Sequence, residues 1–276
     1  MKPKVLIFFH SATGNTCWIA EKLADGLKGH AAEVDTCTIA QRPAVIDFSG
    51  YNLIGFGCPI MGFRPSFAMT RFIDSLPIQQ NILSFIFTTS TGILANGPWM
   101  LASKLQRRGF MVVAHKNFFC EESWPILRAV GLISNRGKPN EESLADVNRY
   151  SRQLLSVIQG LKGDRNFQPS QIPFSRLNPF YYLALQVTPK KLSGMMGKKT
   201  VVEQKCNQCG YCMTHCAVEA IRLNPYPEFN EKCTGCWGCF NICPEGAIRT
   251  VVGSRGRYRA KVSCLSHFTG AKDMKG

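Results

Sequence analysis

Eight of the thirteen cysteines in this sequence lie in two neighbouring runs that share one spacing, C-x2-C-x2-C-x3-C. The segment KCNQCGYCMTHCAVEAIRL, which begins at Lys205, aligns with KCTGCWGCFNICPEGAIRT, which begins at Lys232, so the two runs form an internal repeat. Cysteine thiolates are soft ligands that suit iron–sulfur clusters. Three closely spaced cysteines can hold three corners of a cubane, and the fourth corner needs a cysteine from elsewhere. The repeat therefore predicts two iron–sulfur clusters.

Residues 201–250 resemble the bacterial two-[4Fe-4S] ferredoxin module, in which the fourth cysteine of each run ligates the other cluster. By that resemblance, the ligands of the first cluster are Cys206, Cys209, Cys212 and Cys243. The ligands of the second cluster are Cys233, Cys236, Cys239 and Cys216. Pro244 follows the second run, as in the family, whereas Ala217 follows the first. This departure affects a local turn and leaves the ligand set intact.

Zinc is the alternative metal for clustered cysteines. A zinc ribbon uses C-x2-C pairs separated by a longer loop, four cysteines in all, and does not account for two tight runs of four. A segment of about fifty residues cannot bury enough apolar core to fold alone, so bound metal would have to stabilise it. We therefore expect this segment to be unfolded without its clusters.

A second pattern with chemical meaning follows the first predicted strand, where the sequence reads HSATGNT over residues 10–16. Small hydroxyl residues and glycine allow successive backbone N–H groups to point at a phosphate, and the dipole of a following helix adds positive potential there. The loop contains no lysine and no GxxxxGK[ST] pattern, which excludes a nucleotide-hydrolysing P-loop. The pattern predicts a phosphate-binding loop of another kind.

This loop closely resembles the FMN phosphate loop of flavodoxins, which bind FMN at the switch point between the first and third strands. The resemblance implies that the segments after the third and fourth strands border the flavin ring. The implied cofactor-binding residues are Ser11, Ala12, Thr13, Gly14, Asn15, Thr16, Pro59, Ile60, Met61, Gly62, Thr89, Ser90, Thr91 and Gly92. Met61 stands where the family often has an aromatic residue, and Phe63 or Trp99 could take that role. The alternative is a flavodoxin fold without flavin.

The elements that must position these loops alternate along residues 1–163. The hydrophobic pattern predicts strands at 4–10, 34–39, 51–57, 82–89 and 110–114 and helices at 15–28, 66–75, 98–108 and 141–161. Such alternation is typical of a parallel sheet with helices on both faces, here a doubly wound, five-stranded, flavodoxin-like α/β fold. Residues 115–140 form a long connection, and connections of that length are usually functional or carry structure of their own.

We expect four parts along the chain: a flavodoxin-like domain, a linker, a small α+β ferredoxin-like domain and a basic tail. Their bounds are 1–163, 164–199, 200–253 and 254–276. The linker holds the apolar segment PFYYLALQV, for which we favour docking across the domain boundary. A membrane-surface contact helped by Lys190 and Lys191 is the less favoured interpretation.

Composition and charge limit the classes of function. The chain has 276 residues, 45% hydrophobic content and 11% aromatic residues, which excludes a disordered chain. No apolar run approaches the ~20 residues of a membrane helix, and the apolar run at residues 5–9 is too short for a signal peptide, so a cytoplasmic protein is expected. The net charge of +15 is densest in the linker and tail, and no nucleic-acid partner is expected.

Together the motifs resemble a flavodoxin–ferredoxin fusion of anaerobic bacteria and archaea. The resemblance implies electron transfer between two [4Fe-4S] clusters and FMN, relaying low-potential electrons to or from a partner redox protein. The alternative is a flavin-dependent reductase of a small molecule, fed through the clusters. A relay needs an open flavin edge, whereas a reductase needs an enclosed pocket that residues 115–140 and the linker could roof. A solvated tail is the favoured interpretation of Arg255, Arg257, Arg259 and Lys261. The alternative is that this segment folds back over the clusters or docks an acidic redox partner.

Overall fold

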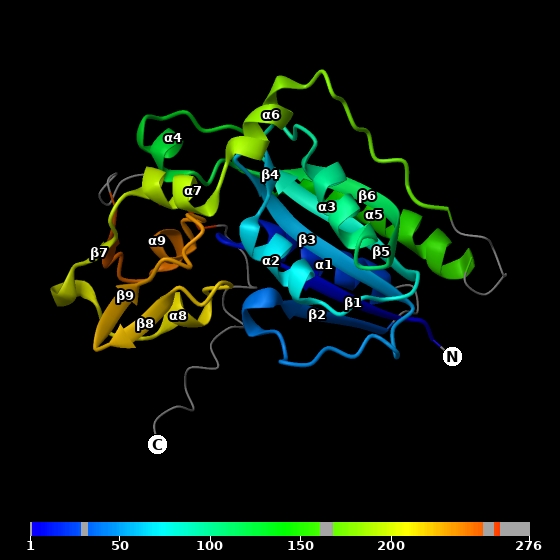
Figure 1. Ribbon diagram of the computed structural model, residues 1–276, viewed down its shortest axis with the longest axis horizontal. Coiled ribbons are helices and arrows are strands. Elements are labelled where there is room, and N and C mark those ends of the chain that lie inside the picture. The colour runs from blue at the N-terminus through cyan, green and yellow to red at the C-terminus, as the bar shows by residue number, and fades with distance from the viewer. Residues whose placement is uncertain (1, 29–32, 161–167, 251–256, 260–276) are drawn as a thin grey trace.

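The computed structural model describes residues 2–28, 33–160, 168–250 and 257–259. Five parallel strands form the central sheet of the first domain in the order β2-β1-β3-β5-β6 (Figure 1). These strands are β1 (Lys4–Phe9), β2 (Glu33–Thr38), β3 (Leu53–Met61), β5 (Ile82–Ser90) and β6 (Phe110–Phe119). A two-residue strand, β4 (Arg64–Pro65), pairs antiparallel with the end of β3. The strand order is the flavodoxin-like one, so the predicted fold class is confirmed.

Helices cover both faces of this sheet and enclose two apolar cores. On one face, α1 (Asn15–Lys28) and α5 (Glu141–Gly160) pack over β1, β5 and β6. On the other face, α2 (Phe67–Ser75) and α3 (Gly97–Gln106) pack over β1, β3, β5 and β6. A short 3-10 helix, η1 (Ile39–Gln41), follows β2 and contributes to the second core.

Two glycines in β3 make room for two phenylalanines in β5. The register pairs Gly55 with Phe85 and Gly57 with Phe87, so both pairs lie on the same face of the sheet. A Cβ atom at Gly55 would lie 2.4 Å from the Phe85 ring, and one at Gly57 would lie 2.0 Å from the Phe87 ring. Any larger residue at either position would clash with a fully buried aromatic ring.

Two strands extend beyond their predicted bounds, and one connection is correspondingly shorter. β3 runs to Met61 rather than to residue 57, because Cys58 and Pro59 continue to pair with β5. β6 runs to Phe119 rather than to residue 114, since it pairs with β5 as far as Ser90. The predicted long connection is therefore shorter, and it contains the helix α4 (Pro125–Ala129).

The segment predicted as a linker contains two helices, α6 (Pro179–Gln186) and α7 (Pro189–Met196). Each begins at a proline and has a side-chain cap: Asn178 accepts the Phe180 N–H at 3.1 Å, and Thr188 accepts the Lys191 N–H at 3.2 Å. α6 packs on the first domain through Phe180, whose ring centroid lies 4.9 Å from that of Phe63. In Figure 1, α6 lies at the edge of the sheet domain, and α7 lies between it and the last domain.

The cysteine-rich segment folds as a small domain whose backbone repeats. Its elements are β7 (Thr200–Val201), η3 (Glu203–Lys205), α8 (Tyr211–Thr214), β8 (Ile221–Asn224), β9 (Tyr226–Phe229), α9 (Gly238–Ile242) and β10 (Ile248–Arg249). Left-handed φ values recur at equivalent positions of the two runs: at Gln208 and Gly235, at Gly210 and Trp237, and at Glu219 and Gly246. Positive φ is uncommon outside glycine, so its recurrence at both glycine and non-glycine positions shows that the repeat extends to the backbone.

Within the described residues, no helix combines the length and apolarity needed to span a membrane.

Candidate functional site

One cavity of about 620 Å³ lies where the first domain, the linker helices and the cysteine-rich domain meet. The carboxyl ends of β1, β3 and β5 open into it, as expected for parallel strands around a switch point. All of the predicted cofactor-binding residues except Gly14 line this cavity. The structure thus brings together three loops that lie far apart in the sequence, although the cofactor roles of these residues stay predictions.

The side chain of Ser11 shapes the loop after β1. Ser11 Oγ accepts hydrogen bonds from the N–H groups of Gly14 at 3.1 Å and Cys17 at 3.2 Å. Gly14 has φ of 101°, which a residue with a side chain would rarely adopt. α1 begins at Asn15, so the first N–H groups of this helix and its positive dipole end face the cavity. Thr16 fixes the loop to β5 through a 2.8 Å hydrogen bond with the Thr89 hydroxyl.

His10 anchors the start of the same loop. Its backbone N–H donates to the Gly57 carbonyl at 2.9 Å, and its ring Nδ1 lies 2.9 Å from Ser66 Oγ. Burial lowers the pKa of His10 to about 4, so the ring is neutral at pH 7. His10 is therefore a structural residue here rather than a charged ligand of the phosphate.

The aromatic residues around the cavity differ from those expected. Phe63 lines it, but its ring also packs on Phe180. Trp99 is not among the lining residues, and its ring packs on Phe174 with the centroids 4.4 Å apart. Trp124 and Trp237 line the cavity instead. No sequence pattern placed Trp237 there, because it lies within a cysteine run of the other domain.

The remaining walls come from segments whose role sequence reasoning left open. Residues 120–124 form one wall, and Glu122 within it is only 7% exposed. Its carboxylate oxygen Oε1 accepts the Trp124 N–H at 2.7 Å. The helices α6 and α7 add Leu183, Leu192 and Met195. Two features of the sequence pointed to these segments: the length of the predicted connection at 115–140, which favoured a functional segment, and the apolar linker segment, which was expected to dock across the domain boundary.

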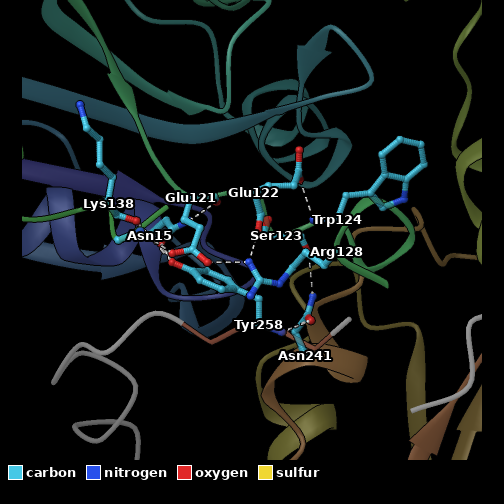
Figure 2. Close-up of polar contacts among 10 residues, drawn as sticks. Asn15, Glu121, Glu122, Ser123, Trp124, Arg128, Lys138, Asn241 and Tyr258 are labelled. Atoms are coloured by element: carbon cyan, nitrogen blue, oxygen red, sulfur yellow. Dashed lines mark hydrogen bonds and ion pairs between the residues drawn. The ribbon is translucent and has the colours of Figure 1, made fainter. Parts of the chain in front are cut away.

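A polar network behind this wall joins three distant parts of the chain (Figure 2). Arg128 Nη1 donates to the Glu121 carboxylate at 2.6 Å and to the Glu122 carbonyl at 2.7 Å. Burial opposes ionisation of Glu121, but the hydrogen bonds from Arg128 and the Gly137 N–H outweigh it and lower the pKa of this carboxyl. The ion pair therefore holds residues 121–128 in one conformation at neutral pH.

Tyr258, from the C-terminal part of the chain, completes the network and reaches the phosphate loop. Its hydroxyl donates to Asn15 Oδ1 at 2.8 Å, and Asn15 Nδ2 donates in turn to the Glu121 carbonyl at 3.3 Å. The Arg128 guanidinium lies 4.7 Å from the centre of the Tyr258 ring, a cation–π distance. The Tyr258 N–H donates to Asn241 Oδ1 at 2.9 Å. One residue thus connects the phosphate loop to a helix of the cysteine-rich domain.

The cysteine side chains lie in two groups. One small pocket is lined by Cys206, Cys209, Cys212 and Cys243. In the other group, burial and then the neighbouring Cys216 and Cys233 raise the pKa of both Cys236 and Cys239. Each group contains three cysteines of one run and the last cysteine of the other run. Among the described residues, no three His, Cys, Asp or Glu side chains close on a single metal ion.

The surroundings of the sulfur atoms are apolar but supply backbone donors. Burial, followed by neighbouring thiols, raises the pKa of Cys212 and Cys236 to about 12. Such thiols ionise only when a bound cation compensates the charge. The Ala220 N–H donates to Cys216 Sγ at 3.2 Å, and the Ala247 N–H donates to Cys243 Sγ at 3.3 Å, so equivalent residues of the two runs make the same bond. Thiolates in an apolar shell with N–H donors fit an iron–sulfur cluster.

The two cysteine groups stand in different relations to the large cavity. Cys236 lines the cavity together with Gly235 and Trp237. A Cβ atom at Gly238 would lie 3.5 Å from the Ala12 carbonyl oxygen, so the backbone of the cysteine run packs directly on the phosphate loop. Among the described residues, none lines both the first group's pocket and the large cavity. Only the second group forms part of the cavity wall.

Residues 227–249 match the family model described as the 4Fe-4S binding domain. The chain therefore contains at least one 4Fe-4S binding domain. It is also similar to a pyruvate dehydrogenase [NADP(+)] of Cryptosporidium parvum, with 27% identity over a region that covers 37% of this chain and 7% of that protein. The chain thus spans only a small part of the length of this curated relative.

Solved structures similar to this chain include two flavodoxins. One is a flavodoxin from the domain Archaea, with 17% identity and a TM-score of 0.41, covering 56% of this chain and 99% of that one. The other is flavodoxin 1 from Bacillus cereus, with 18% identity and a TM-score of 0.41, covering 55% of this chain and 97% of that one.

Proposed function

We propose that this protein is an iron–sulfur flavoprotein that transfers electrons between two [4Fe-4S] clusters and FMN and relays them to or from a partner redox protein. The observation that carries this proposal is that Cys236, a cysteine of the second group, shares a wall with the phosphate loop in one cavity. Clusters carry one electron at a time, whereas FMN carries one or two, so joining them allows one-electron and two-electron chemistry to be interconverted.

The residues of the cavity fit FMN by the chemistry of their donors. The backbone at the start of α1 and the hydroxyls of Thr13 and Thr16 suit a phosphate, and no acidic side chain lies in that loop. Pro59, Ile60 and Met61 offer an apolar wall for a flat ring. Gly62 has φ of 58°, which lets the β3–β4 turn close tightly beside this wall.

The cysteines fit two clusters held by crossed ligand sets. In this arrangement Cys243 completes the first group and Cys216 completes the second, as the pocket lining and the mutual charge effects of the thiols support. The recurrence of the N–H to sulfur hydrogen bonds gives these two crossing cysteines equivalent surroundings. The chain thereby stabilises both clusters with one repeated backbone geometry.

Cofactor analysis after anaerobic purification tests this proposal directly. We expect about eight irons and one FMN per chain, from eight ligand cysteines and one phosphate loop. Stepwise reduction should bleach the cluster absorption and the flavin absorption in the same protein. Zinc in place of iron, or a single cubane after full reconstitution, would overturn the two-cluster part. Absence of flavin from protein that holds both clusters would overturn the flavin part.

The apolar walls of the cavity favour a second candidate function, direct reduction of a small molecule. Trp124 and Leu127 from one side and Leu183 and Leu192 from the other line the cavity, which gives apolar walls beyond the predicted flavin site. Glu122, buried in the same wall, adds one polar group to this otherwise apolar part of the lining.

A larger side chain in the apolar wall of the cavity distinguishes the two functions. Leu183→Trp adds bulk to the apolar wall that α6 contributes and leaves the residues of the loops after β1, β3 and β5 unchanged. A reductase should then lose activity toward a small quinone but keep its rate of electron transfer to a reduced or oxidised ferredoxin. A relay should keep both rates, and equal rates for wild type and variant would remove the support for a reductase.

A further inference from the structure

The linker helices and the turn before them present an apolar surface to solvent. Leu177 is 93% exposed, Leu185 is 53% exposed and Tyr182 is 51% exposed. Leu183 and Met195 are about half exposed as well. We call these five residues the α6–α7 face. Several large apolar side chains exposed on one short stretch of chain are typical of an interaction site.

The α6–α7 face is not needed to hold α6 in place. The opposite side of α6 is already packed: Ala184 is fully buried, Phe180 contacts Phe63, and the Tyr181 ring lies 5.4 Å from Phe174. Hydrogen bonds between Asn96 and Ser175, at 2.9 and 3.2 Å, fix the segment that leads into the helix. Leu177, Tyr182 and Leu185 do not line the cavity, so their exposed apolar side chains call for a reason other than packing around it.

The charged side chains in the segment that carries this face are all basic. Between residues 168 and 199 the sequence contains five Lys or Arg and no Asp or Glu. Arg176 lies next to Leu177, and Lys190 and Lys191 lie in the first turn of α7; all three are exposed. Leucine and tyrosine side chains flanked by basic residues are typical of helices that lie in the interface of an anionic lipid layer. An acidic protein would satisfy the basic residues but would not need so many exposed apolar side chains.

We propose that the α6–α7 face rests on an anionic lipid surface, with the apolar side chains in the headgroup region and the basic side chains on the lipid phosphates. Leu183 and Met195 also line the large cavity, so this contact would place the mouth of the cavity against the lipid layer. The proposal adds a lipid contact on the outer side of this segment, whose inner side packs on both domains as favoured from sequence. It does not depend on which cofactors the cavity holds.

Vesicle binding by the purified holoprotein tests the proposal. The probes are vesicles of phosphatidylcholine alone and of phosphatidylcholine with phosphatidylserine, with sedimentation measured at low and high salt. We expect binding to the anionic vesicles that weakens with salt. Each basic residue near an anionic surface contributes about 1 kcal/mol, so Lys190→Gln with Lys191→Gln should weaken binding by about thirtyfold. Leu177→Ser with Leu185→Ser should weaken it at both salt concentrations.

Matched variants outside this face separate the proposal from general attraction of a basic protein. Lys28→Gln with Arg152→Gln removes two exposed cations on α1 and α5, and Val45→Ser with Ile78→Ser removes two exposed apolar side chains on other loops. These four substitutions should leave vesicle binding unchanged, and the visible spectrum checks folding in every variant. Equal losses in test and control variants, no binding to anionic vesicles, or binding only to an acidic redox protein would overturn the proposal.

Discussion

Removing the Tyr258 hydroxyl should weaken the hold on the phosphate loop. Tyr258→Phe deletes the 2.8 Å hydrogen bond to Asn15 Oδ1 but keeps the ring beneath the Arg128 guanidinium. A neutral hydrogen bond of this kind contributes about 1 kcal/mol net. If all of that energy holds Asn15 in its binding conformation, the Kd for FMN should rise by about fivefold. The cluster content should stay unchanged.

A second substitution at Tyr258 separates the effect of its hydroxyl on FMN binding from the effect of its ring. Tyr258→Leu also removes the ring, and a cation–π contact contributes roughly 0.5–2 kcal/mol depending on its exposure, so this variant should bind FMN more weakly than Tyr258→Phe. Tyr51→Phe is the matched control, since it deletes a 2.8 Å hydrogen bond to Asp35 on an exposed surface that does not line the cavity. FMN affinity is measured by flavin fluorescence quenching on reconstitution. Wild-type affinity in both Tyr258 variants would refute the reasoning.

Three further outcomes are expected from the structure. Cys216→Ala should perturb the second cluster and leave the first with four ligands, and loss of the first cluster alone in paramagnetic resonance would reverse the assignment. Gly235→Ala should lower the stability by about 1–3 kcal/mol in thermal unfolding, because a Cβ there would lie 2.4 Å from the backbone of Leu192 at φ of 68°, and an unchanged Tm would contradict the packing. The pKa of the Glu121 carboxyl is lower in the folded protein than its value of about 4.3 in the unfolded chain. The ion pair with Arg128 therefore stabilises the fold fully when the pH is above that unfolded value. This stability is lost as the pH falls through the pKa that Glu121 has in the folded protein. Glu121→Gln should therefore cost about 2 kcal/mol at pH 7 and less at pH 4 in denaturant unfolding, and a cost that does not fall with pH would contradict the ion pair.

The sequence predicted the features that follow from local pattern. The hydrophobic pattern predicted all five parallel strands, and the resemblance of the first loop to that of flavodoxins implied that the loops at Ser11, Pro59 and Thr89 meet, as they do at one edge of the sheet. The cysteine repeat likewise predicted two equivalent halves, and its spacing recurs in the backbone conformation of Gln208 and Gly235. Both patterns depend on the types of residues that lie close together in the sequence.

The second half of β6 was missed because its residues look like a loop. His115, Lys116 and Asn117 are polar, yet they pair with Ile86, Phe87 and Thr88 of β5. Asn117 is held by side-chain hydrogen bonds on both sides, accepting from Thr88 at 2.9 Å and donating to Ser90 at 3.1 Å. A polar strand end is stabilised by such partners, which a sequence pattern does not reveal.

The linker helices were missed for a different reason. Asn178-Pro179 and Thr188-Pro189 are typical helix starts, but a helix of eight residues is not stable without tertiary packing. The rings of Phe63, Trp99 and Phe174 supply that packing for α6. The α7 helix packs through the backbone of Leu192 on Gly235. The bond between Asn15 and Tyr258 spans 243 residues and has no local signature at all.

The basic tail residues that the structure describes differ in their contacts and exposure. Arg255 and Lys261 lie outside the described residues. The Arg257 guanidinium donates to the carbonyls of Phe240, Gly246 and Ile248 and lies 4.1 Å from the Phe240 ring centre. It therefore holds the cysteine-rich domain together and is not available to a partner. Arg259 is exposed, so it is the described tail residue that suits an interaction with another protein.

The positions of the two cysteine groups also predict the order in which electrons would pass through the proposed cofactors. Cys236 of the second group lines the large cavity, whereas the first group shares no described lining residue with it. Cys209 of the first group is exposed, and Cys212 beside it is buried. A partner protein that docks near Cys209 would therefore exchange electrons with the first cluster, which would pass them to the second cluster and then to the flavin. If Cys216 and Cys243 cross between the two clusters as proposed, the same repeat that would hold the metal would also fix this order.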